Sequence, residues 1–319
     1  MALTAALDRY YLEIAQHGAD PASYLKQLAL IAQIIGPQIH LSAIDDDKIA
    51  LMVARLRGRK NNRGKLLANG TVNRYTEALR RVWKRAAKIW KVDVGDEPDW
   101  GAHLLEEADE RVRDLAQAEE AKLLDSLRED MRPMVRFSLM SGLRLANVRM
   151  LTWKSVDFEA QSITIKMKSK KPGGRVHTIP LTTAMIALLA NERGHHPIYV
   201  FTYECRKSRD KRRKGERYPF SRDGWRKAWD AARKAAGLED FRFHDNRHTA
   251  ATRIVRATGN LKIAQKLLGH TEITTTSRYA HALTEDVRNA MEAAQSRNIP
   301  STQDAGSQKG KSKQSTKGR

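Results

Sequence analysis

The sequence predicts a mainly α-helical chain with a small antiparallel β-sheet, organised as two domains. Apolar residues recur at every third or fourth position through most of the 319 residues, as in helices that bury one face. Residues 163–181 instead contain two short runs with strand-like alternation. An acidic segment with Gly and Pro breaks the helical pattern at 92–114. We therefore expect a helical domain over 1–98, a linker over 99–114 and a second domain over 115–296.

The first domain is expected to consist of helices. One begins at Asp20 and Pro21, because an Asp cap followed by proline is a typical helix start, and it ends at Gly36. A second helix runs from about Asp46 to Leu56. After a basic loop, a third helix carries apolar residues at helical spacing from Val72 to Ile89 and arginines on another side. This arrangement predicts a packed interior and a basic outer surface.

The second domain is expected to combine helices with one β-hairpin. Its helices are predicted at 116–127, 131–139, 144–151 and 225–236, with a short one after Thr182 and others continuing to about 295. The hairpin pairs 163–167 with 176–181 across a turn rich in Lys and Gly. Residues 297–319 are rich in Lys, Ser, Gly and Gln, which predicts a disordered basic tail.

The charge balance points to a polyanionic partner. A net charge of +21 and a pI near 10.1 favour nucleic acid, the commonest polyanion in cells. No apolar run approaches the ~20 residues that a membrane-spanning helix needs. Asp8 and Arg9 come too early for a signal-peptide core. The single cysteine, Cys205, excludes an intrachain disulfide and fits a reducing compartment, so we expect a cytoplasmic protein without a membrane partner.

Residues 243–253, FHDNRHTAATR, concentrate imidazole and guanidinium groups. His244 and His248 are one helical turn apart, which imitates the zinc-protease pattern H-E-x-x-H with Asp245 in place of the glutamate. His244 and Arg247 could instead share one phosphate from the same helix face. A solvated basic helix would show the same residues. The stretch alone leaves these three interpretations open.

Four segments of the second domain together resemble the tyrosine recombinases, also called the phage integrase family. The resemblance spans about 115–282, in order and at the family's spacing. Its most specific feature is a tyrosine nine residues after the histidine of LLGH. The segments are SGLRLANVRMLTW with Arg144, the hairpin turn with Lys168, HDNRH with His244 and Arg247, and LLGHTEITTTSRYAHA with His270 and Tyr279.

The resemblance implies a reaction and assigns its residues. Tyr279 would attack the scissile phosphate and form a 3′-phosphotyrosyl bond, and His244 would accept the phenol proton because imidazole titrates near the working pH. Neither a metal ion nor a cofactor is implied. Lys168 is the preferred lysine of the hairpin turn, and Lys166, Lys170 and Lys171 surround it. The remaining roles fall to Arg144 and Arg247 as the phosphate clamp, His270 as the second active-site histidine, and Lys168 as the proton donor to the leaving 5′-oxygen.

The same resemblance implies a two-domain clamp around double-stranded DNA. Such recombinases work as homotetramers on two synapsed sites, through a Holliday junction. The resemblance also implies a protein of bacterial or phage origin that is associated with the nucleoid when bound to DNA. The sequence identifies no accessory DNA-bending protein. A segment with Leu283, Val287 and Met291 at helical spacing could dock on a neighbouring subunit or pack on its own domain. The candidate DNA-contacting cations are Arg59, Lys60, Arg63, Lys65, Arg74, Arg81, Arg85, Arg212 and Arg213.

Two positions depart from the family pattern. Asn147 stands where an acidic residue is usual, and its carbonyl could still hold Arg144 by a hydrogen bond. Asn246 replaces the common leucine of H-x-L-R, which puts a packing contact in doubt. Two alternatives remain beside a recombinase: a DNA-binding protein of this fold without catalysis, and a DNA-relaxing enzyme of the type IB topoisomerase class.

Overall fold

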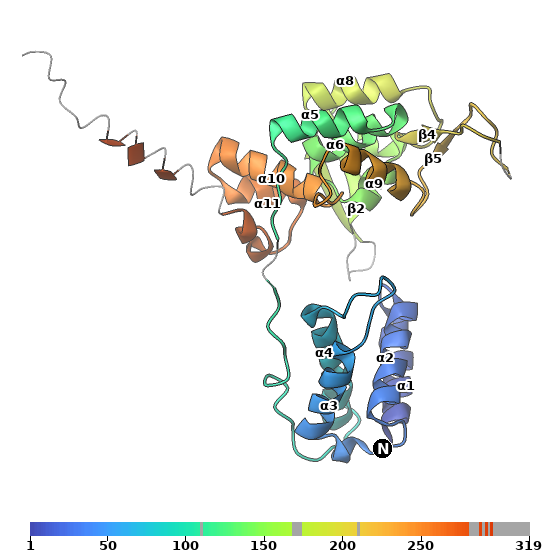
Figure 1. Cartoon of the computed structure of the whole chain (residues 1–319), viewed down its shortest axis with the longest axis vertical. Helices are drawn as coiled ribbons and strands as arrows, with labels where there is room; N and C mark the ends of the chain where they lie inside the picture. Colours follow the sequence, from blue (N-terminus) through green and yellow to red (C-terminus); the bar gives the residue numbers. More distant parts are fainter. Residues whose placement is uncertain are drawn as a thin grey trace, which may run out of the picture. The chain divides into compact units, whose positions relative to one another are not determined.

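The computed structural model describes residues 1–108, 111–167, 174–208, 211–280, 287–288, 291–292 and 294–295. The chain divides into two compact units, unit 1 (Met1–Glu110) and unit 2 (Arg111–Arg319). Both consist mainly of helices, and among the described residues the antiparallel strands belong to unit 2 (Figure 1). The predicted fold class, mainly helical with a small antiparallel sheet, is confirmed for the described residues.

Unit 1 is a group of helices around one apolar core. The Asp20 side chain accepts a hydrogen bond from the Ser23 backbone N–H at the start of α2, and Asp45 caps α3 through Lys48 in the same way. The core contains Ile31, Ile49 and Leu79, which are all fully buried. The sequence prediction lacks α1. The helices are α1 (Leu3–Glu13), α2 (Pro21–Ile35), α3 (Asp46–Arg57) and α4 (Asn69–Lys88).

The expected linker over 99–114 does not stand apart from the two units. Trp100 is buried in the core of unit 1, where its ring meets Trp83 edge to face. The Asn73 side chain bonds to both the N–H and the carbonyl of Leu105. At the other end, Leu115 is buried in unit 2. Composition alone does not reveal these contacts, which depend on tertiary packing.

Unit 2 surrounds its core with helices and two separate β-sheets. β2 pairs with β3 with Ile163 opposite Ile179, as expected for a hairpin, and β1 extends that sheet. The predicted turn of this hairpin lies partly outside the described residues. The sequence predicts an extended segment at 199–203 (YVFTY), which overlaps β4, but not its pairing with β5. The strands are β1 (Val156–Asp157), β2 (Ser162–Met167), β3 (Arg175–Pro180), β4 (Thr202–Glu204) and β5 (Arg217–Pro219).

Helix α10 packs against α6 and α11 (Figure 1). Both neighbours end in a glycine with positive φ, Gly142 at +61° and Gly269 at +65°. The helices of unit 2 are α5 (Gln117–Ser126), α6 (Arg132–Ser141), α7 (Leu145–Arg149), α8 (Thr183–Glu192), α9 (Arg226–Ala235), α10 (Asp245–Thr258) and α11 (Leu261–Leu268).

The length and apolarity of the helices show whether any of them could cross a membrane. Across the described ranges, no helix is both long and apolar enough to cross a bilayer. The predicted basic tail, 297–319, lies outside the described residues, as does Leu283. Val287 and Met291 from the segment that follows Tyr279 are 55% and 57% exposed.

Candidate active site

The first turn of α10 is buried although it is polar. Asp245, Asn246, Arg247 and His248 are each at most 5% exposed. The Asp245 carboxylate accepts a hydrogen bond from the Arg242 backbone N–H at 2.8 Å, which stabilises the start of the helix. A solvated basic helix would expose these side chains, so that interpretation of residues 243–253 is wrong. Buried charge of this kind needs specific partners.

Arg247 finds its partners at the ends of two helices. Nη1 donates to the carbonyl of Gly142, and Nη2 donates to the carbonyl of Leu268, both at 2.8 Å. These carbonyls lie at the C-terminal ends of α6 and α11, where the helix dipoles place partial negative charge. Burial, followed by the charge of Arg144, lowers the pKa of Arg247 to about 10. The guanidinium therefore stays protonated at neutral pH and is held in one orientation.

His270 is fixed by contacts on both ring nitrogens. Nε2 lies 2.8 Å from Nη2 of Arg247, and Nδ1 lies 2.9 Å from the hydroxyl of Thr276. Since the guanidinium can only donate, Nε2 accepts, and Nδ1–H faces the hydroxyl. Burial, followed by the charge of Arg247, lowers the pKa of His270 to about 4. The ring is therefore neutral at physiological pH, with its proton on Nδ1.

Tyr279 lies inside unit 2, on a short 3₁₀ turn after α11. It is 1% exposed and packs with apolar residues that include Val255 and Leu268. Its hydroxyl lies 2.9 Å from Nδ1 of His248. Burial raises the pKa of Tyr279, while the charge of Arg247 acts in the opposite direction. The phenol is therefore protonated, and it lies close enough to Arg247 for that charge to act on its pKa.

The sequence prediction does not include His248 among the site residues. The expected proton acceptor, His244, has its ring 5.1 Å from that of His248, nearly perpendicular to it. The sequence did contain a signal, because His248 follows Arg247 directly and lies one helical turn beyond His244. Burial, followed by the charge of Arg247, lowers the pKa of His244. The α10 side chain that bonds to the tyrosine hydroxyl is therefore the second histidine.

Arg144 is exposed and stands at the start of α7. Its positive charge lowers the pKa values of Arg247, His244 and His270, so it lies beside the same site. Nη1 of Arg144 and the amide of Asn147 both approach the sulfur of Met167, at 3.9 and 3.7 Å. Among the described residues, the side-chain hydrogen bond expected between Asn147 and Arg144 does not occur, and both side chains instead approach this sulfur. Lys168 lies outside the described residues.

The zinc interpretation finds no geometric support. His248 directs Nδ1 to Tyr279, and Asp245 directs its carboxylate to a backbone N–H. Within the described part of the chain, no three or more His, Cys, Asp or Glu side chains are grouped to hold a metal ion. Two of the three groups in the zinc pattern, His248 and Asp245, thus serve other contacts.

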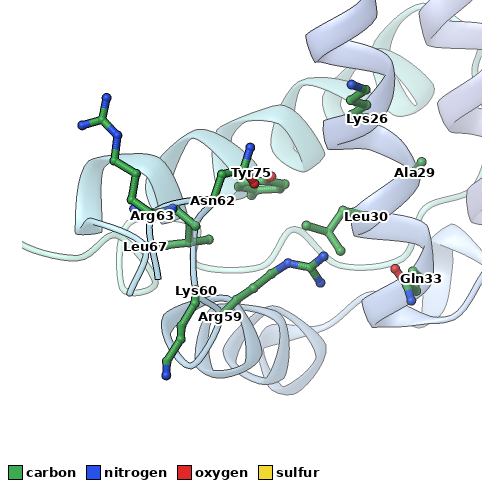
Figure 2. Close-up of a pocket in the computed structure, with 11 residues that line it drawn as sticks. Lys26, Ala29, Leu30, Gln33, Arg59, Lys60, Asn62, Arg63, Leu67 and Tyr75 are labelled. Carbon is green, nitrogen blue, oxygen red and sulfur yellow. The ribbon is translucent and has the colours of Figure 1, made fainter. Parts of the chain in front are cut away.

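A second cluster of functional candidates lies on unit 1, in a basic pocket between α2, α4 and the loop after α3. Figure 2 shows Arg59 extending toward α2, where it approaches Gln33 and Leu30. Lys26 from α2 also lines this pocket but is absent from the sequence prediction. The lining residues are Lys26, Ala29, Leu30, Gln33, Arg59, Lys60, Asn61, Asn62, Arg63, Leu67 and Tyr75.

The other cations expected to contact DNA have different surroundings. Arg85 is occupied by Glu13, with two nitrogen–oxygen distances of 3.0 and 2.9 Å that tie α4 to α1. Arg212 and Arg213 are exposed between β4 and β5, and Arg212 lies 5.8 Å from the centre of the Tyr203 ring. Three of the predicted DNA-contacting cations, Lys65, Arg74 and Arg81, are exposed but do not line the basic pocket. Arg81 borders a separate hollow with Arg80, Lys84 and Arg85.

Comparison with known proteins gives this geometry a context. The model of the phage integrase family matches residues 108–286. An integrase of Salmonella phage P22 is 32% identical over 182 residues, which cover 56% of this chain and 47% of that protein. The chain thus spans about half the length of the curated relatives it matches.

Two solved structures show the likeness of fold. The Tn1549 transposon integrase in complex with a circular-intermediate DNA superposes with a TM-score of 0.71 at 18% identity, over 92% of this chain and 99% of that one. A lambda integrase tetramer bound to a Holliday junction gives 0.63 at 20% identity, over 88% and 77% of the two chains.

Proposed function

Because the chain belongs to the phage integrase family, we propose that it is a tyrosine-type site-specific DNA recombinase. One observation supports this most: a buried tyrosine hydroxyl lies in the same chain beside an arginine whose guanidinium is fixed by three partners. A DNA-binding protein without catalysis has no need of such a group. A topoisomerase-like enzyme would use the same first step, so strand exchange between two DNA sites is the test that separates it.

The first chemical step is attack by the Tyr279 oxygen on the scissile phosphorus. The new bond joins the phenolic oxygen to the 3′-phosphate, the bond to the 5′-oxygen breaks, and the strand is left with a free 5′-hydroxyl. The phenol proton goes to a neutral imidazole of the site, for which His244 is the candidate. Lys168 is the candidate donor to the leaving oxygen.

Arg247 and Arg144 supply positive charge where negative charge develops in the transition state. Arg247 is already held in place before DNA arrives, so its guanidinium does not have to reorganise when the reaction occurs. Arg144 is exposed and can reach a phosphate from outside the site. The intermediate preserves the energy of the phosphodiester bond, and a 5′-hydroxyl from the partner strand completes the exchange by the reverse reaction.

DNA binding would involve both units. The basic pocket of unit 1 and the cations of the β4–β5 loop are the candidate backbone contacts, because exposed Lys and Arg neutralise phosphates. We propose that the two units form a clamp on duplex DNA and that four chains act on two sites through a Holliday junction. The reaction would take place on DNA in the cytoplasm.

A nicked duplex that traps the cleaved strand tests this function. The wild-type protein should become covalently attached to DNA, whereas Tyr279→Phe should not, because phenylalanine lacks the attacking oxygen. Tyr199→Phe, which removes a hydroxyl elsewhere in unit 2, is the matched control and should attach like the wild type. Attachment by Tyr279→Phe would show that another residue is the nucleophile.

Mixing two inactive variants tests whether each chain uses its own tyrosine. The hydroxyl of Tyr279 is held within its own unit, so cleavage should occur in cis. A mixture of Tyr279→Phe and Arg144→Ala proteins should then remain inactive, because neither chain has a complete site. Arg144 is exposed, so its replacement should leave the fold intact. Recovery of cleavage in the mixture would indicate exchange of the tyrosine between chains.

A further inference from the structure

The hydroxyl of Tyr279 faces inward, although a nucleophile must meet its substrate. The whole residue is 1% exposed, and its ring packs with Ala251, Val255, Ala264 and Leu268. The hydroxyl contacts Nδ1 of His248 at 2.9 Å. In this position the oxygen has a bonded partner inside the protein and is shielded from solvent. Attack therefore requires the phenol to move away from the histidine.

His248 is well placed to hold the phenol. It projects from the same buried turn as Arg247 and is 4% exposed, and its ring centre lies 5.7 Å from that of Tyr279. Burial, followed by the charge of His244, lowers the pKa of His248 to about 4. At neutral pH the imidazole is therefore uncharged, and its Nδ1 lone pair can accept a hydrogen bond from the phenol. Asp245, Arg247 and Arg111 are the other charged groups that act on this ring.

We propose that His248 is a positioning residue for the nucleophile: its Nδ1 accepts a hydrogen bond from the Tyr279 hydroxyl and holds the phenol inside unit 2 until DNA is bound. This inference rests on the proposed role of Tyr279 as nucleophile. The bond adds to the apolar packing of the ring, and its removal would leave a buried hydroxyl without a partner. DNA binding must then exchange the His248 contact for the scissile phosphate before cleavage begins.

Nitration of tyrosines in the DNA-free protein tests this role. Tetranitromethane modifies accessible phenols, and peptide mass spectrometry reports Tyr279 separately from the other tyrosines. In the wild type, Tyr279 should react much more slowly than the half-buried Tyr199. In His248→Ala, the nitration rate of Tyr279 should rise about tenfold, the size expected when a buried hydroxyl no longer has its hydrogen-bond partner.

A conservative variant separates hydrogen bonding from general packing. The Oδ1 atom of asparagine occupies nearly the same place as Nδ1 of histidine, so His248→Asn should restore protection of Tyr279. Thermal unfolding of both variants, followed by circular dichroism, shows whether the fold is intact. Equal nitration in the wild type and a folded His248→Ala protein would overturn the proposal, because packing alone would then hold the ring. Failure of the Asn variant to protect would overturn it as well.

The assay contains no DNA, so its result is independent of the recombinase reaction. If Tyr279 were protected by His248 but never attached to DNA, the proposed function would fail while the role of His248 in holding the phenol stood. If attachment occurred without this protection, the function would stand and the role of His248 would fall.

Discussion

The pocket cations of unit 1 and the buried Arg247 of unit 2 occupy opposite environments. Arg59 and Lys60 of unit 1 are exposed and line an open basic pocket. Arg247 of unit 2 is 3% exposed, and its guanidinium is committed to two carbonyls and an imidazole. Exposed cations adjust to a phosphate backbone and are screened by salt. A buried guanidinium instead supplies fixed geometry. The pocket of unit 1 thus supplies attraction to DNA, and Arg247 supplies a fixed geometry for the reaction. Each can be altered separately.

The largest expected effect is on the cleavage rate when the buried Arg247 is replaced. Arg247→Lys keeps the positive charge but cannot reach two helix ends and a phosphate together. We expect the single-turnover rate of covalent attachment to fall by roughly 10²–10³, the cost of removing one preorganised donor, while DNA affinity changes little. Arg256→Lys on the same helix, which is exposed and paired with Asp114, is the control. A large drop in affinity with unchanged chemistry would contradict the division.

Removing charge from the pocket of unit 1 should produce the reverse pattern. A triple Ala variant at Arg59, Lys60 and Arg63 is expected to weaken DNA binding and to reduce the slope of log affinity against log salt by roughly 2–3, about one for each phosphate that is no longer neutralised. The measurement is a fluorescence-anisotropy titration at several salt concentrations. Lys48→Ala, in the first turn of α3 and away from the pocket, should leave the slope unchanged. An unaltered slope in the triple variant would remove this pocket from the DNA interface.

Buried asparagines offer a smaller contrast between the same units. In unit 1, Asn73 is bonded through both its amide and its carbonyl. In unit 2, Asn246 is fully buried, and neither its nitrogen nor its oxygen has a hydrogen-bond partner within the described residues. Leucine at position 246 should therefore raise the free energy of unfolding by about 1 kcal/mol, whereas Asn73→Leu should lower it by about 1–3 kcal/mol. Urea unfolding measures both, and a destabilised Asn246→Leu protein would refute the first expectation.

The smallest expected effect is a difference in acid sensitivity. The pKa of His248 and that of His270 are about 4 in the folded chain, against an ordinary value of 6.5. Between these values the unfolded chain binds protons that the folded unit 2 does not, so its stability falls as pH drops from about 6.5 toward 4. Arg9, and then Trp90 and Arg85, lower the pKa of Glu13 in unit 1 to about 2, so that contribution is lost only in stronger acid.

Hydrogen exchange followed by mass spectrometry can read the two units separately. From about pH 7 to pH 5, unit 2 should lose stability, because the unfolded chain binds protons at both imidazoles that the folded unit does not. Unit 1 should change less. Equal losses in both units would mean that the buried histidines do not control the acid response.

The main elements of the fold and most of the candidate site could be predicted from the sequence. Apolar spacing predicted α2, α3, α4 and the β2–β3 hairpin, because each element buries one face. The family resemblance marked Arg247, His270 and Tyr279 at three separated points, which the fold brings together. The hydrogen bond between Tyr279 and His248 was not predicted, because the family resemblance assigned no role to His248 and the bond depends on tertiary packing. The packing of Trp100 on Trp83 depends on tertiary contacts in the same way.

The most direct test of the central claim is to map the covalent link itself. After trapping on a nicked duplex, nuclease and protease digestion should yield one modified peptide, with Tyr279 joined to a 3′-phosphate and a free 5′-hydroxyl on the released strand. A link at another residue, or attachment through a 5′-phosphate, would contradict the proposed chemistry.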